Sequence, residues 1–376
     1  MPLTLRPYAT AGVAIVGAGL VAVTPVAAPL PAPETPREVS LTAGWLSDLI
    51  QPWQDMINTT SANASILLDN YFIAPGLALQ QFMVNQADFA QQLLDDPTSL
   101  PAVTAQLQQN LAAVLTGYSL SDPSTNVLNS VINHTLSPAN GLDYTGHYGI
   151  FGLLPTYMPP DQADLVNPIL NFLSSPLSGI IIGSLGPAIS PWVALMNSIT
   201  DGDGFNEILV NMVGAYFNGA TLDLGFLLPL INDSGYLPGG MGLAHLDFAF
   251  GGLLTPGNVA IGPYGVDGTD IPAVGGSIFN SVGLTMTGVP FVGQFPIESF
   301  AVGPIGAWMG WEQTLASLLG WTTVGGGWDG KGPIDVGPPG VELDLPTIPD
   351  DLLDDGGASA LAADASSWLE DLLGAF

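Results

Sequence analysis

Residues 205–226 read FNEILVNMVGAYFNGATLDLGF, and the hydrophobic period changes inside this stretch. Over residues 205–217 apolar side chains recur every three or four positions, as on one face of a helix, and Asn218-Gly219 is typical of a helix C-terminus. After Gly219 apolar and polar residues alternate, as in a strand with one buried face. The stretch predicts an α+β fold with a helical N-terminal half followed by short antiparallel strands.

The region before this boundary, residues 45–219, carries further helical patterns. Apolar residues repeat at three-to-four spacing over residues 45–57 and again over 103–114. Asp122-Pro123 and Ser190-Pro191 have the residue types of a helix cap followed by a first-turn proline. We therefore expect residues 45–219 to be mainly helical, with helices beginning near both dipeptides.

A stretch without any charged residue lies between Leu165 and Thr200. Prolines and glycines interrupt it repeatedly, and proline inside a helix removes a hydrogen-bond donor and clashes with the preceding turn. We expect short pieces here, with Ile180-Ile181-Ile182 in a turn rather than in a spanning helix. That turn is interpreted as part of the protein core, with dipping into a membrane as the alternative.

Residues 220–330 are rich in glycine and proline and contain three alternating segments. The segments contain Leu222, Leu246 and Val282, respectively. In each segment apolar residues alternate with polar ones, as in a strand with one apolar and one polar face. A Trp-rich helix is expected over residues 306–321. The segments are too short for the roughly 9 to 11 alternating residues of a spanning barrel strand.

The two ends of the chain have compositions of their own. Residues 1–28 resemble a secretory signal peptide, with Arg6 ahead of an apolar run and small residues at its end. Residues 29–44 form a Pro-rich linker, residues 331–357 an acidic linker, and residues 358–376 an amphipathic C-terminal helix. An exported chain without cysteine has no disulfides, so its stability must come from its core, from assembly or from lipid.

The charge balance excludes several classes of partner. The chain has 33 acidic residues, and Arg6, Arg37 and Lys331 are its only Lys or Arg residues. Nucleic acid and anionic lipid head groups would be repelled. Yet the mean hydropathy is positive and only 10% of the residues are charged, where roughly 25% is usual. We expect a protein of an apolar or crowded envelope environment.

No pattern in the sequence predicts catalysis, a cofactor or a metal. No G-x-S-x-G turn occurs, and His134, His147 and His245 form no H-E-x-x-H pair, so each histidine is interpreted as structural. The run Asp201-Gly202-Asp203-Gly204 has carboxylates spaced as at the start of a calcium loop, but Phe205 follows where a ligand is needed. A helix-capping turn is the favoured interpretation, and we expect no enzyme activity.

Four segments carry a family resemblance. LTLRPYATAGVAIVGAGLVAVTPVAAP over residues 3–29, VSLTAG over 39–44, FGGLLTPGNVAIGPYG over 250–265 and VGPIGAWMGW over 302–311 are similar to the GjpA-type outer-membrane porin family of mycolic-acid-containing actinobacteria. The resemblance implies an outer-envelope location and channel formation. It implies no particular pore residue.

Two functions are therefore predicted. The first is an outer-membrane or cell-envelope porin-like protein, a homo-oligomer that passes small hydrophilic solutes by diffusion and prefers cations because carboxylates would surround its mouth. A helical oligomeric pore, or a mixed fold peripheral to the outer layer, suits the helical half best. The alternative is a non-catalytic secreted or envelope-associated protein that binds lipid or another protein.

Overall fold

The computed structural model describes residues 43–321, apart from residues 74, 139–145, 158–159, 236, 238, 262–263, 267–268 and 290–292. The chain divides into the units Met1–Asp48 and Leu49–Phe376, and the second unit contains the features discussed below. The predicted signal peptide, nearly all of the Pro-rich linker, the acidic linker and the C-terminal helix lie outside the described residues.

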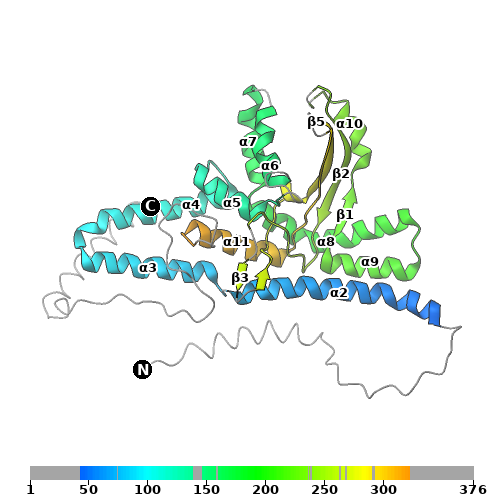
Figure 1. Ribbon diagram of the computed structural model, residues 1–376, viewed down its shortest axis with the longest axis horizontal. Coiled ribbons are helices and arrows are strands. Elements are labelled where there is room, and N and C mark those ends of the chain that lie inside the picture. Colours follow the sequence, from blue (N-terminus) through cyan, green and yellow to red (C-terminus); the bar gives the residue numbers. More distant parts are fainter. Residues whose placement is uncertain are drawn as a thin grey trace, which may run out of the picture. The chain divides into compact units, whose positions relative to one another are not determined.

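The fold is α+β, as predicted, with helices first and a small sheet later (Figure 1). The longer helices are α2 (Ala43–Ile73), α3 (Leu77–Asp95), α4 (Leu100–Ser119), α5 (Thr125–Thr135), α6 (His147–Tyr157), α7 (Pro160–Leu173), α8 (Pro176–Asp201), α9 (Phe205–Asn218) and α11 (Pro304–Leu318). The short helix α10 spans Leu228–Asn232. The predicted change at Gly219 is confirmed, because α9 ends at Asn218 and strand β1 starts at Ala220.

The sheet is antiparallel, with the strand order β1-β2-β5-β6. Its strands are β1 (Ala220–Asp223), β2 (Gly242–Phe250), β5 (Val282–Val289) and β6 (Gly293–Ile297), and β3 (Tyr264–Val266) pairs separately with β4 (Thr269–Ile271). The predicted alternation sets the two faces: Phe248 and Phe250 pack with Ile180, Ile182 and Val302 in one hydrophobic cluster. The apolar face of the sheet therefore lies against α8.

Helix α11, predicted over residues 306–321, connects the hydrophobic clusters. It packs on α3, α4, α5 and α8. Leu318 is fully buried in a cluster with residues of α4, α5, α6 and α7, and Ala307 belongs to the cluster that joins α8 to the sheet. A helix from the end of the described chain thus completes a core begun by the N-terminal helices.

The prediction for the uncharged stretch was wrong. Residues Pro176–Asp201 form one continuous helix, α8, which contains Pro187 and Pro191. Ser190 is accordingly not a cap; its hydroxyl donates to the carbonyl oxygens of Phe250 and Gly251, at 3.1 and 3.0 Å. Tertiary packing of this kind outweighs the cost of two internal prolines, which sequence propensity alone does not reveal.

Close packing against backbone explains how α8 stays intact. A Cβ on Gly179 would clash with the carbonyl oxygen of Gly276, and one on Gly186 would clash with that of Gly251. A Cβ on Gly183 would lie 2.9 Å from the carbonyl oxygen of Gly303. These glycines let three loops from the second half of the chain reach the helix backbone.

A smaller correction concerns the start of α5. The sequence predicted a cap at Asp122 with Pro123 in the first turn, but the N-cap is Ser124, whose hydroxyl accepts a hydrogen bond from the Val127 amide. Pro123 therefore precedes the helix. Serine and aspartate are both good caps, so residue type alone does not choose between neighbouring positions.

Candidate functional site

Two of the three histidines are buried structural groups. His134 on α5 places its Nε2 3.0 Å from the Ser317 hydroxyl of α11, and burial lowers its pKa to about 4. His147 at the start of α6 places Nδ1 2.9 Å from the Ser137 hydroxyl and Nε2 2.6 Å from the Val282 carbonyl oxygen. Burial also lowers the pKa of His147 to about 4, against smaller opposing effects of the Val282 carbonyl and Asp247.

The Ser137 and His147 pair does not form a nucleophilic site. Ser137 is fully buried, so no substrate reaches its hydroxyl in this structure. The His147 Nε2, which would carry a proton to a substrate, instead lies against a backbone carbonyl oxygen. The pair holds α6 against the start of β5, which is a structural role.

The third histidine lies on the polar side of the sheet. His245 Nε2 is 2.7 Å from the Asp247 carboxylate on the same strand, and Asp223 of β1 is directly opposite Asp247. Among the described residues no group of three or more His, Asp or Glu has the arrangement of a metal site.

The Asp-Gly-Asp-Gly run is a capping turn, as the sequence predicted. Gly202 is the C-cap of α8 in the left-handed conformation, and Gly204 is the N-cap of α9. The Glu207 carboxylate accepts a hydrogen bond of 2.7 Å from the Gly204 amide. Glycine relieves the strain of the left-handed turn, and the acid satisfies an amide at the start of α9.

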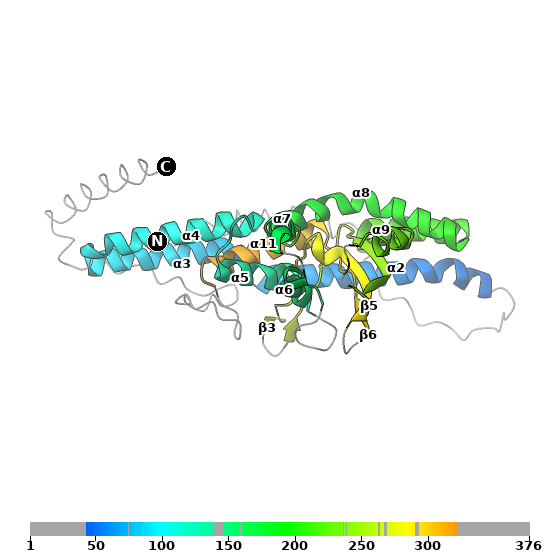
Figure 2. The ribbon, with the colours of Figure 1, turned by 90° about the horizontal axis from the view of Figure 1, so that it is seen from above.

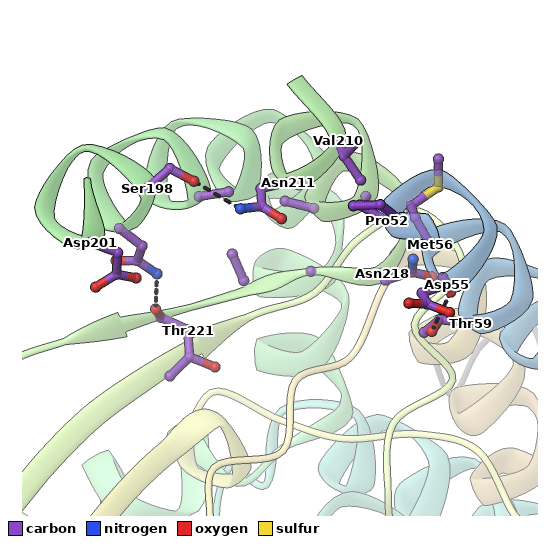
Figure 3. Close-up of a pocket in the computed structure, with 16 residues that line it drawn as sticks. Pro52, Asp55, Met56, Thr59, Ser198, Asp201, Val210, Asn211, Asn218 and Thr221 are labelled. Atoms are coloured by element: carbon purple, nitrogen blue, oxygen red, sulfur yellow. Dashed lines mark hydrogen bonds between the residues drawn. The ribbon is translucent and has the colours of Figure 1, made fainter. Parts of the chain in front are cut away.

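A cleft of about 530 Å³ with both polar and apolar lining residues lies among α2, α8, α9 and β1 (Figure 3). Asp55 of α2 and Asp201 of α8 lie at opposite ends of it. Neither Lys nor Arg occurs anywhere in residues 43–321, so no such cation neutralises these carboxylates within the described chain.

The amide side chains of the cleft direct their N–H groups into the protein. Asn197 donates to the Thr221 carbonyl oxygen at 2.9 Å, and Asn211 donates to the Ser198 hydroxyl at 2.9 Å (Figure 3). Asn218 donates to the Thr60 hydroxyl at 2.9 Å. Because these amide N–H groups are already engaged, the carboxylates of Asp55 and Asp201 are the charged acceptors of the cleft, which suits hydroxyl-rich solutes or hydrated cations.

The outer surface of α8, next to this cleft, carries exposed apolar residues. Successive helix residues are rotated by roughly 100°, so positions three, four, seven and eleven apart share a face. Five large apolar residues follow that spacing and are exposed: Ile181, Leu185, Trp192, Met196 and Ile199. We call these five residues the α8 stripe.

The α8 stripe lies opposite the small residues of the same helix. Gly179, Gly183 and Gly186 are buried against the loops, and Ser190 and Ser198 are buried farther along. Trp192 and Ile199, by contrast, remain 64% and 65% exposed. The helix thus packs its glycines against the loops, together with the buried Ile180 and Ile182, and carries a second apolar face that is exposed.

Helix α9 has a similar arrangement. Its exposed apolar residues are Phe205, Leu209, Val213 and Tyr216, while Val210, Asn211, Gly214 and Asn218 line the cleft. Figure 2 shows α9 between α8 and α2. Both helices of the α8–α9 pair therefore line the cleft mostly with polar or small residues and have an exposed apolar face away from it.

Sequence reasoning missed the α8 stripe because it assumed a broken helix. A signal was present: the spacing from Ile181 to Ile199 is helical throughout, and Gly179, Gly183 and Gly186 also share one side. By length and composition α8 can cross a membrane, and 44% of its apolar window is buried.

Comparison with known proteins adds no relative. No protein-family model matches the chain, and neither the curated proteins nor the solved structures contain a significant match. The porin resemblance stays a prediction that rests on the four sequence segments.

Proposed function

We propose that this protein is a non-catalytic protein of the cell envelope that binds an apolar partner, lipid or protein, through the α8 stripe. The observation that carries this proposal is the second apolar face of α8, whose five large side chains are exposed on the side opposite the buried glycines. The predicted signal peptide and the low fraction of charged residues suit that setting.

Burial of the α8 stripe would contribute a favourable free energy to association. Full burial of one large apolar side chain contributes about 1.5–3 kcal/mol. The five side chains of the stripe are 39–65% exposed, so their remaining burial contributes about 1 kcal/mol each, or roughly 5 kcal/mol together. Contiguous apolar surface of this kind marks protein or membrane contacts.

A matched pair of variants tests the proposal. Ile199 in the α8 stripe and Leu115 on α4 are both 65% exposed. We expect Ile199→Glu to move the full-length protein from the detergent phase to the aqueous phase in a two-phase nonionic detergent experiment, or to abolish its self-association. Leu115→Glu should change neither. Equal effects of the two substitutions would contradict a specific role for α8.

The second candidate is porin-like diffusion of small hydrophilic solutes through an oligomer in the outer membrane. The cleft favours it, because Asp55 and Asp201 line the cleft while the opposite face of α8 is apolar. Carboxylates without neighbouring cations would attract cations and repel anions.

Single-channel conductance across a planar bilayer with a salt gradient separates the candidates. A channel of this protein should show discrete steps with a cation-selective reversal potential. Anion selectivity would refute the role of the carboxylates. A silent bilayer with demonstrably inserted protein would eliminate the pore and leave the binding function.

A further inference from the structure

We infer that the α8 stripe lies flat in the surface of an uncharged lipid layer, with the axis of α8 parallel to that surface. This inference rests on the proposed function and names its partner. Ile181, Leu185, Trp192, Met196 and Ile199 enter the boundary between head groups and acyl chains, and the rest of α8 stays on the protein side.

The length and composition of the stripe suit this orientation. The segment from Ile181 to Ile199 covers roughly 27 Å along the helix, and no charged residue lies anywhere on it. An in-plane helix buries its apolar face only about 5–10 Å deep. Trp192, near the middle of the stripe and 64% exposed, has the amphipathic ring that favours a membrane interface.

The packing of the opposite face argues against a spanning orientation. Irregular loops contact α8 along its glycine side, at Gly251, Gly276 and Gly303. Near the C-terminal end, Asn197 binds the edge strand β1 through the Thr221 carbonyl oxygen. A spanning α8 would carry these loops and the sheet into hydrocarbon, where exposed irregular backbone is not tolerated.

The negative charge of the protein favours an uncharged lipid over an anionic one. Asp201, Asp203 and Glu207 lie at the junction of α8 and α9, beside the end of the stripe. Arg6, Arg37 and Lys331 all lie outside the described residues, and the whole chain has a formal net charge of −30. An anionic surface therefore repels the protein, and screening by salt weakens that repulsion.

Vesicle flotation tests the lipid partner with the full-length protein. The protein should float with phosphatidylcholine vesicles, and Ile199→Glu should weaken binding at least tenfold while Leu115→Glu leaves it unchanged. Adding phosphatidylglycerol should weaken binding, and salt should restore it. Stronger binding to the anionic vesicles, or equal loss in both variants, would overturn the inference.

The absence of cysteine allows the depth of α8 to be measured directly. In the separate variants Ile181→Cys and Ile199→Cys, the thiol can carry an environment-sensitive fluorophore. Quenchers placed at known depths in the lipid then report the depth of each label. A flat helix places both labels at the same shallow depth. Labels at different depths across the bilayer would show a spanning helix and refute the parallel orientation.

The outcomes separate this inference from the proposed function. If the protein fails to float on uncharged vesicles while Ile199→Glu still abolishes detergent partitioning or self-association, the lipid inference fails and the α8 stripe binds protein. If Ile199→Glu and Leu115→Glu behave alike in every assay, both proposals fail together.

Discussion

Replacing Gly186 by alanine is expected to destabilise the protein, although the same change usually stabilises a helix. The new Cβ would lie well inside 3.0 Å of the Gly251 carbonyl oxygen, and 3.0 and 3.1 Å from the carbonyl carbon and amide nitrogen of that residue. All three are backbone atoms, so no side chain can move aside. Overpacking of this kind costs about 1–3 kcal/mol.

The opposing gain is smaller. Alanine is favoured over glycine in a helix by up to about 1 kcal/mol. The clash at Gly251 involves backbone atoms only, so its cost falls at the upper end of the overpacking range. We therefore expect Gly186→Ala to lower the free energy of unfolding by about 1–2 kcal/mol net.

Denaturant unfolding followed by circular dichroism measures this change, and Gly152 supplies the control. Gly152 lies in α6, and a Cβ there would have nothing within 4 Å, so Gly152→Ala should be neutral or stabilising by up to about 1 kcal/mol. If Gly186→Ala proves as stable as Gly152→Ala, then α8 does not approach the loop at Gly251 closely. In that case the glycines of α8 do not face the protein interior.

Three further predictions concern buried polar groups. Ser175→Ala removes the hydroxyl that caps α8 and should cost about 1 kcal/mol in denaturant unfolding. Asn280 donates a hydrogen bond of 2.9 Å to the Asn258 carbonyl oxygen, and a carboxylate has no proton to donate there. Asn280→Asp should therefore lower the free energy of unfolding by about 2–3 kcal/mol at neutral pH. The loss should be smaller in acid, where the carboxyl group regains a proton. His134 and His147 have pKa values of about 4 in the folded state against 6.5 when exposed, so unfolding takes up protons between these values. The contribution of the neutral histidines to the free energy of unfolding is fully present above pH 6.5 and should fall as the pH drops toward 4, by on the order of 3 kcal/mol for each histidine. Thermal melts across that pH range measure this loss.

Much of the local structure could be predicted from the sequence. The C-terminus of α9 at Asn218-Gly219, the existence of strands β2 and β5 and the capping turn at Gly202 all follow from residues within a few positions of one another. Short-range rules of period and capping describe such features well. The starting point of α5 was misplaced by two residues, because Asp122 and Ser124 are both suitable caps.

The candidate surfaces depended on contacts distant in sequence. The cleft joins Asp55 of α2 to Asp201 of α8, and its amides bind partners on other elements. His147 meets the Val282 carbonyl oxygen far along the chain. No local pattern predicts contacts between residues so distant in sequence. The sequence therefore predicted a structural role for His134 and His147, but it indicated neither their partners nor the cleft.

Helix α8 shows most clearly what each level determines. The sequence by itself determined that residues between Leu165 and Thr200 carry no charge, and that bulky and small residues alternate there at helical spacing. It could not determine that the helix survives Pro187 and Pro191, or which of its sides faces outward. The tertiary structure decided both, because only Gly-sized residues allow the loops at Gly251, Gly276 and Gly303 to reach the helix backbone, and this contact leaves the bulky apolar side exposed.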